Sequence, residues 1–342
     1  MIDRSLTDRQ ERILRYVVEA FIADGQPVGS KTLVARGVVD AAPSTVRAEL
    51  AALEERGMLD HPHTSAGRVP TDTGYRRYVE TLLRAPLVPT RLPVDFSFAH
   101  RELDTALDAT AEALARMTNL LAVVSAPSLG TTVIRHVELL RLQPTVVMAV
   151  VITSTGGVVK RLFVFDQPVD TGLVDWAADY LEETVVGQSP GALTLRRRFA
   201  DPGHGPAERA FLETIAPLCT DLAGDGDGSV HLGGTASLLA ELQVRDLEAV
   251  RDVVRALEDR LELLAMLREA VDADRLSVRV GDELVVPALR SLALVSAPYG
   301  IGSRSLGTVT VVGPTRMDYG AAIRSVRGAA AALSEFVEEI YG

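Results

Sequence analysis

The stretch DHPHTSAGRVPTDTGYRRYV, residues 60–79, combines turn-forming residues, hydroxyls and arginines, and it is too polar to be part of a protein core. A pair of strand-like residues lies on each side of its most turn-rich segment, residues 61–67. This arrangement predicts a hairpin with strands at residues 58–59 and 68–69 and a connecting turn at residues 61–67. Thr71 follows as the expected cap of another helix.

The sequence before the hairpin predicts a first helix that begins with a capping box. The hydroxyl of Thr7 can accept from the amide of Gln10, whose side chain can reach back to the amide of Thr7. Gly25 is the expected end of this helix. Between these limits, apolar residues recur at the spacing of one helix face: Ile13, Leu14, Val17, Val18, Phe21 and Ile22.

Two further helices are expected between the first helix and the hairpin. Ser30 is predicted to cap a short helix that Gly37 terminates. Ser44, after Pro43, is predicted to cap a longer helix that closes at Gly57. Two helices joined in this way form a helix-turn-helix, so the hairpin that follows is predicted to be the wing of a winged-helix DNA-binding domain.

The third helix is the expected recognition helix, because the N-terminal end of such a helix meets base edges in the major groove. Arg47 can pair bidentately with a guanine, a contact worth about 1–3 kcal/mol of discrimination, and Thr45 can touch a thymine methyl or a phosphate. The alternative is that Arg47 is an ordinary solvated helix residue. If Val46, Leu50 and Leu53 face the core, the outward residues near this end are Ser44, Thr45, Arg47, Ala48 and Ala51.

Further DNA contacts are expected from the second helix, the hairpin and the helix after it. Thr64, Ser65 and Arg68 would lie beside the phosphate backbone, where hydroxyls and arginine position a protein rather than read sequence. Arg76 would extend this basic edge. The expected contacts outside the recognition helix are Ser30, Lys31, Thr32, His63, Thr64, Ser65, Arg68 and Arg76.

Metal binding at the hairpin is an alternative, because His61 and His63 form a His-x-His pair. A zinc site needs at least three protein ligands, and no third ligand is evident nearby in the sequence. We therefore expect no metal.

The charge of the 342-residue chain is unevenly distributed. The formal net charge is −11, which is unusual for a nucleic-acid binder. Residues 1–85 contain twelve basic and twelve acidic residues, whereas the remainder contains 23 and 34. The acidic excess therefore belongs to the rest of the chain, and we expect weak nonspecific DNA binding with a modest salt dependence.

The rest of the chain predicts an α+β fold. Residues 85–96 contain three prolines and are expected to be a linker of limited flexibility after a DNA-binding domain at residues 1–84. Helix and strand patterns then lie on both sides of a more helical segment, residues 187–276. Helices are expected at residues 98–124, 173–185 and 319–341, and strands at residues 131–142, 145–153, 158–165, 277–286, 292–297 and 306–312.

This order predicts one α+β domain, residues 97–186 and 277–342, interrupted by an inserted domain at residues 187–276. Within the insert, residues 246–271 carry a long apolar stripe. The stripe is either a domain core or a subunit interface that packs against its two-fold mate.

Several other classes of protein are not expected. The single cysteine, Cys219, excludes an internal disulfide and fits a reducing cytoplasm. We expect no signal peptide, and no apolar run of the sequence reaches the roughly 20 residues that span a bilayer. No nucleophile with its base, no Walker A lysine and no other cofactor motif can be assembled. We expect a cytoplasmic protein that is not an enzyme and binds no cofactor.

Five segments resemble the HrcA family of bacterial heat-inducible transcription repressors. They are PVGSKTL (27–33), STVR (44–47), PHTSAGRVPTDTGYRRYV (62–79), GGTASLLAEL (233–242) and VVGPTRMDYGAAIRSV (311–326). The chain departs from the family pattern at Ala48 and Ser237, where asparagine is usual. The first departure could alter one base contact.

The resemblance implies that the α+β domain is GAF-like, that the insert is a dimerisation domain, and that the protein acts as a homodimer. It also implies binding to a CIRCE-type inverted repeat upstream of chaperone operons, with activity supported by the chaperonin GroEL. The competing hypothesis is a winged-helix regulator that senses a small ligand through the GAF-like domain. From the residues alone, GPTRMDY (313–319) is predicted to be a strand-to-helix corner, with Thr315 as the cap.

Overall fold

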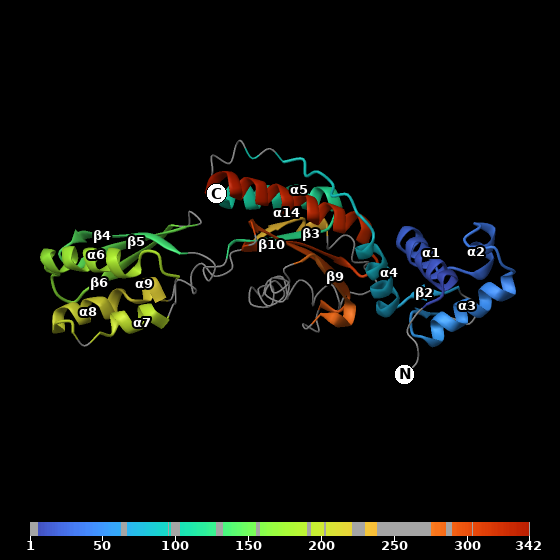
Figure 1. Cartoon of the computed structure of the whole chain (residues 1–342), viewed down its shortest axis with the longest axis horizontal. Coiled ribbons are helices and arrows are strands. Elements are labelled where there is room, and N and C mark those ends of the chain that lie inside the picture. Colours follow the sequence, from blue (N-terminus) through green and yellow to red (C-terminus); the bar gives the residue numbers. More distant parts are fainter. Residues whose placement is uncertain are drawn as a thin grey trace.

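The chain has a mixed α and β fold, and its described residues form three separate sheets, arranged as three bodies in a row (Figure 1). We call them the head (residues 6–84), the central body (residues 103–127, 230–237 and 275–341) and the lobe (residues 133–220). The computed structural model describes residues 6–62, 67–94, 96, 103–127, 133–154, 158–189, 193–201, 203–220, 230–237, 275–284, 289–302 and 304–341. No helix among these residues has both the length and the apolar character that a bilayer-spanning segment needs.

The head contains three helices, a short hairpin and a fourth helix. The predicted capping box is confirmed, because the amide of Gln10 donates to Thr7 Oγ1 and the amide of Thr7 donates to Gln10 Oε1. Gly25 ends the first helix in the left-handed conformation (φ 64°). The elements are α1 (Asp8–Asp24), α2 (Ser30–Ala35), α3 (Pro43–Glu55), β1 (Leu59–Asp60), β2 (Val69–Pro70) and α4 (Asp72–Arg84).

Two predicted helix caps in the head are wrong. Gly29, not Ser30, is the N-cap of α2, and Ala42, not Ser44, is the N-cap of α3. At α3 the reason is Pro43, which favours the first helical position and forces the residue before it into an extended conformation. At α2, Val28 forms a bridge with Arg68, so the chain turns into the helix at the next residue. The predicted cap of α4, Thr71, is confirmed by its bond from the amide of Gly74.

The central body is a five-stranded antiparallel sheet in the order β7-β3-β10-β9-β8, with α5 and α14 packed on one face (Figure 1). The predicted helix at residues 98–124 is too long: α5 ends at Thr118, because Asn119 takes a left-handed conformation (φ 55°). The elements are α5 (Leu103–Thr118), β3 (Leu121–Ser125), β7 (Val230–Gly233), β8 (Ser277–Val280), η3 (Gly281–Glu283), β9 (Leu292–Ile301), β10 (Arg304–Pro314) and α14 (Tyr319–Tyr341).

The lobe has its own three-stranded sheet in the order β4-β5-β6, with helices on one face (Figure 1). Its buried residues form a cluster separate from that of the head and central body. The elements are β4 (Ile134–Gln143), β5 (Val146–Thr153), β6 (Val158–Val164), α6 (Thr171–Val185), α7 (Leu193–Phe199), α8 (Pro206–Ile215) and α9 (Pro217–Thr220).

The two hydrophobic cores divide between residues 127 and 133, not at the predicted boundary between residues 186 and 187. Within the described part of the chain, the three strands of the lobe pair only with one another, and they bury their inner face against helices that follow them in sequence. They therefore do not join the larger sheet, although the prediction placed them in the same α+β domain as that sheet. The apolar stripe at residues 246–271 lies outside the described residues.

The proline-rich linker lies along α14. The amide of Thr90 donates to the carbonyl of Arg324 (3.0 Å), and a side chain at Gly328 would overlap the carbonyl of Thr90. Phe96 and Phe336 bring their ring centroids to 4.9 Å. The linker is thus held against the central body over much of its length.

Candidate nucleic-acid interface

The outer face of α3 presents polar and small side chains over its first two turns. Val46, Leu50 and Leu53 are buried, which confirms the predicted inner face. Ser44, Arg47 and Ala48 are exposed, and Thr45 is half-buried. Among the described residues, Arg47 has no hydrogen-bond or ion-pair partner, so its guanidinium is available to an external group.

The N-terminus of α3 suits an anion. Its N-cap, Ala42, provides no side-chain acceptor, and its first turn contains no acidic residue. The amides of Ser44 and Thr45 therefore lack a side-chain cap, at the end of the helix that carries a partial positive charge. Exposed amides of this kind are common contacts for phosphate.

Helix α2, which packs against α3, contributes two of the three predicted residues to this surface. Lys31 and Thr32 are exposed, whereas Ser30 is only 9% exposed and is packed into the head. The prediction that Ser30 contacts DNA is therefore not supported by its position. Arg36, at the end of α2, is an exposed cation that the prediction did not include.

Arg68 lies at the base of the hairpin and is already paired. Its Nη2 is 2.7 Å from Glu54 Oε2, and its side chain is only 23% exposed. Its backbone bonds to Val28 in both directions, and a side chain at Gly67 would overlap the backbone of Val28. Arg68 therefore holds the hairpin to the end of α3, and its role beside the phosphate backbone stays a prediction. The predicted contacts His63, Thr64 and Ser65 lie outside the described residues.

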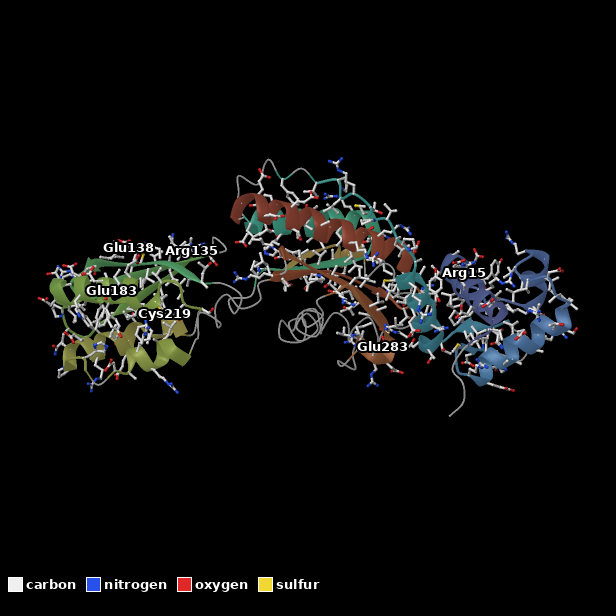
Figure 2. The ribbon with its side chains drawn as sticks, in the orientation of Figure 1. Arg15, Arg135, Glu138, Glu183, Cys219 and Glu283 are labelled. Carbon is white, nitrogen blue, oxygen red and sulfur yellow. The ribbon has the colours of Figure 1, made fainter. Side chains whose placement is uncertain are left out.

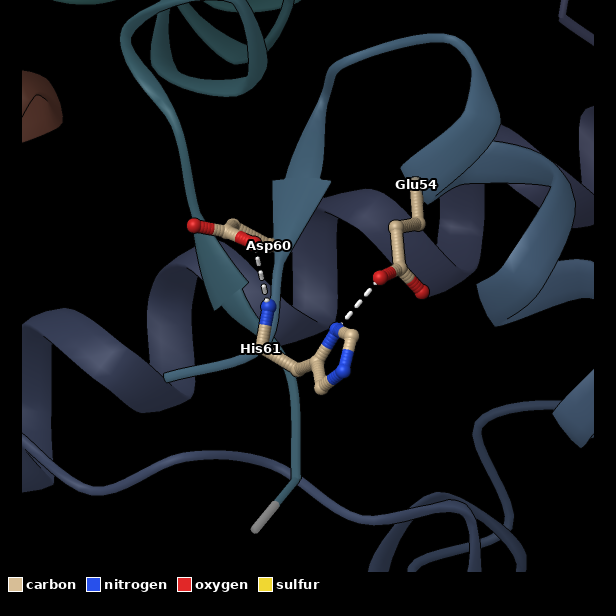
Figure 3. A group of neighbouring side chains, drawn as sticks. All are labelled: Glu54, Asp60 and His61. Atoms are coloured by element: carbon tan, nitrogen blue, oxygen red, sulfur yellow. Dashed lines mark hydrogen bonds and ion pairs between the residues drawn. The ribbon is translucent and has the colours of Figure 1, made fainter. Parts of the chain in front are cut away.

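Glu54, Asp60 and His61 form a compact group, drawn in Figure 3. Each offers one oxygen or nitrogen atom that could bind a metal ion, and these atoms lie within 4.8 Å of one another. Glu54 Oε1 contacts the Nδ1 of His61, and Asp60 Oδ1 accepts the backbone N–H of His61 (2.7 Å). The second oxygen of Glu54 already receives the Arg68 guanidinium. Because a guanidinium at the same carboxylate disfavours a second cation, we interpret this group as an ion-pair cluster that ties α3 to both sides of the hairpin.

Arg76 faces the central body instead of extending the DNA surface. Its Nη1 donates to the carbonyl of Val278 (2.7 Å), and its Nε lies 3.4 Å from Glu283 Oε1 and 3.7 Å from Glu80 Oε1. The position of Arg76 does not support the prediction that it contacts DNA, because the face of α4 that carries it is the face that meets β8. The adjacent Arg77 pairs inside the head, with Glu11 and Glu80.

The GPTRMDY corner also meets the head, a contact that the sequence did not indicate. Tyr319 is fully buried, and its ring centroid lies 5.9 Å from that of Tyr75 on α4. Burial raises the pKa of both phenols, so both stay protonated near neutral pH. The strand-to-helix corner is confirmed, but Asp318, not Thr315, bonds the first turn of α14, by accepting the amide of Ala321 (2.9 Å).

Comparison with known proteins identifies the family of this chain. A family model described as the HrcA protein C-terminal domain matches residues 104–323. A heat-inducible transcription repressor HrcA from Parafrankia sp. is 36% identical, over 98% of this chain and 99% of that protein, and one from Acidothermus cellulolyticus is 38% identical, over 98% of each. A crystal structure of a hypothetical protein shares the fold, with a TM-score of 0.64 at 22% identity over 98% of this chain and 100% of that one. The chain therefore belongs to the HrcA family of heat-inducible transcription repressors.

Proposed function

We propose that this chain is a homodimeric, sequence-specific DNA-binding repressor of heat-shock genes. The observation that carries the proposal is the exposed N-terminal half of α3, where Arg47 has no partner among the described residues and the first-turn amides have no side-chain cap. Membership of the HrcA family supplies the biological setting, because the named relatives are heat-inducible transcription repressors.

On this proposal the head is a winged helix-turn-helix domain. Helix α3 enters the major groove, where Arg47 reads a guanine and Thr45 touches a neighbouring base or phosphate. Lys31 and Arg36 on α2 add phosphate contacts, which orient the head without reading sequence. The acidic remainder of the chain keeps binding to unrelated DNA weak, because few phosphates are neutralised in total.

The dimer is supported by the outer face of the lobe sheet. Leu140, Met148 and Leu162 lie side by side in register across β4, β5 and β6 on the face away from the helices. Leu162 is 59% exposed, and Val164 on the same strand is 74% exposed. An apolar sheet face of this kind marks an interaction site.

A second copy of this chain is the occupant that we propose for that face. The neighbouring row carries Glu138 on β4 and Lys160 on β6, with Val150 between them. Glu138 projects from the upper side of the lobe in Figure 2. Such a face can pair with its own copy about a two-fold axis. In that pairing the Glu138 carboxylate of each copy can meet the Lys160 ammonium of the other, and the apolar rows of the two copies can pack together. This interface would lie in the lobe, whereas the sequence placed the candidate stripe at residues 246–271.

The regulatory setting rests on the family. The operator would be a CIRCE-type inverted repeat upstream of chaperone operons, and the chaperonin GroEL would support the active repressor. The central body would be GAF-like. Dimer symmetry requires that the operator be an inverted repeat, with half-sites spaced to match the two recognition helices.

A ligand-responsive regulator is the second candidate, and one cavity favours it. A cavity of about 580 Å³ lies between the end of α1 and the GPTRMDY corner, and its lining includes Asp24, Asn119, Arg316 and Asp318. The buried hydroxyls of the central sheet do not indicate a ligand site, because the hydroxyl of Ser296 already bonds to that of Thr310 (2.8 Å). The lining carries two carboxylates and one guanidinium, so a rise in melting temperature with a small cationic metabolite, lost in Asp24→Ala, would support this candidate.

Selection from a pool of random duplexes tests the main proposal. Purified full-length protein, with and without chaperonin, should enrich an inverted repeat, and Leu162→Glu should enrich it poorly because the dimer is lost. Val88→Glu is the matched control, since it makes the same charge change at an apolar residue that is 77% exposed and lies outside the lobe. Enrichment of no sequence would refute DNA reading, and enrichment of a single asymmetric site would refute the dimer.

A further inference from the structure

The head and the central body share one continuous hydrophobic core. Tyr75, Tyr78 and Val79 on α4 belong to the same buried cluster as Met317 and Tyr319 of the central body. The tilted contact between Tyr75 and Tyr319 lies at the centre of this junction. The head is therefore packed against the central body and is not simply tethered to it by a linker.

Polar contacts surround this apolar centre. Arg76 joins α4 to the carbonyl of Val278 on β8 and to Glu283 on η3. Asp72, in the first turn of α4, accepts the backbone N–H of Asp282 (3.2 Å). These bonds set the rotation of α4 about its own axis, which the apolar contact alone would leave less defined.

The turn that receives α4 is shaped for this contact. Gly281 has a left-handed conformation (φ 55°), and a side chain at this position would overlap Asp72 Oδ2. Glycine is therefore required twice, for its backbone conformation and for the close approach of the carboxylate. Such a fit indicates that the junction has one preferred geometry.

We propose that Arg76 and Asp72 are positioning residues that fix the head on the central body, and thereby determine which spacing between two half-sites the dimer accepts. This inference rests on the proposed function. Because α4 follows the hairpin directly and packs in the same core as α3, rotation of α4 would move the recognition helix. In a dimer, the two recognition helices are then held at a fixed separation and twist.

If the two heads are fixed, the affinity of the dimer for its operator should depend strongly on the spacing between the half-sites. Each base pair added between half-sites moves the second half-site by about 3.4 Å and rotates it by about 35°. A rigid junction cannot follow this rotation, whereas a loosened one can. Loss of the Arg76 contacts should therefore make binding less dependent on spacing rather than abolish it.

The test uses full-length protein and a series of duplexes that contain the selected inverted repeat, with its centre shortened or lengthened by single base pairs. The wild type should bind the selected spacing at least about tenfold more tightly than its neighbours. Arg76→Ala should reduce this ratio to about twofold, while its affinity for the altered spacings stays the same or rises. Arg77→Ala is the matched control, because among the described residues Arg77 pairs with Glu11 and Glu80, both in the head, and it should keep the wild-type ratio.

A second variant separates positioning from a general loss of stability. Gly281→Ala disturbs the same junction from the central body and should flatten the spacing dependence in the same way, with circular dichroism confirming that each variant is folded. An unchanged ratio in folded Arg76→Ala, or a wild type that tolerates all spacings equally, would overturn the inference. If the wild type binds no inverted repeat at any spacing, the proposed function itself fails.

Discussion

Replacement of Arg47 by alanine should reduce operator affinity without reducing stability. Arg47 is exposed on α3 and has no partner among the described residues, so its loss should change the free energy of unfolding by no more than about 0.5 kcal/mol. Its proposed contact with a guanine is made only in the complex. Binding and folding should therefore separate cleanly in this variant.

The size of the effect follows from one contact per head. A bidentate arginine–guanine pair is worth about 1–3 kcal/mol of discrimination. Because a dimer presents two copies of α3, Arg47→Ala should cost about 2–6 kcal/mol on the full operator, which is roughly 30-fold to 20,000-fold in Kd. The discrimination against other bases should fall at one position of each half-site.

Fluorescence anisotropy at fixed salt measures this loss on the selected inverted repeat and on a scrambled duplex of equal length. Arg15→Ala is the control, because Arg15 projects from α1, where its only described ion pair is a loose one with Glu19 (3.9 Å) (Figure 2). It removes the same charge from the head without touching α3. An equal loss for Arg47→Ala on the selected and scrambled duplexes would refute base reading and leave only a phosphate contact.

Other substitutions test the ion-pair cluster, the packing of the head, the dimer and the buried thiol. Glu54→Gln should lower the stability of the head by about 1 kcal/mol in urea denaturation, because Arg68 and His61 lose a shared partner; an unchanged midpoint would contradict the cluster. Gly74→Ala should cost about 1–3 kcal/mol in the same assay, since its methyl would overlap the carbonyl of Met58, whereas Gly29→Ala, with open space around it, should cost less. Leu162→Glu should convert the dimer to a monomer in sedimentation equilibrium with an unchanged melting temperature, and a persistent dimer would place the interface elsewhere. Burial raises the pKa of the Cys219 thiol to about 12, so Ellman's reagent should react only after unfolding. Because the unfolded thiol ionises near pH 8.5, the stability that the neutral thiol contributes should be lost as the pH rises from about 8.5 towards that value.

Local sequence signals predicted the architecture of the head well. The capping box at Thr7 and Gln10, the glycine stop at Gly25 and the buried face of α3 all depend on residues within a few positions of one another. Propensity and periodicity describe such short-range interactions directly. The two wrong caps also have a local cause, since proline at position 43 and the bridge at Val28 shift each helix start by one or two residues.

Long-range pairing explains what the sequence could not predict. Arg68 and Arg76 are both arginines beside a predicted DNA surface, and nothing local distinguishes them from phosphate contacts. Arg76 binds the carbonyl of a residue 202 positions away, and that partner is defined only by the folded junction. The boundary of the lobe was missed for the same reason, because strand periodicity does not reveal which strands share a sheet.

The central claim is that a symmetric dimer reads two half-sites through its recognition helices. The most direct measurement is the affinity and stoichiometry of full-length protein on the selected inverted repeat, compared with a duplex in which one half-site is scrambled. We predict one dimer per intact duplex and at least about a hundredfold weaker binding when one half-site is lost, because several base contacts disappear together. Equal affinity for the two duplexes would contradict the claim.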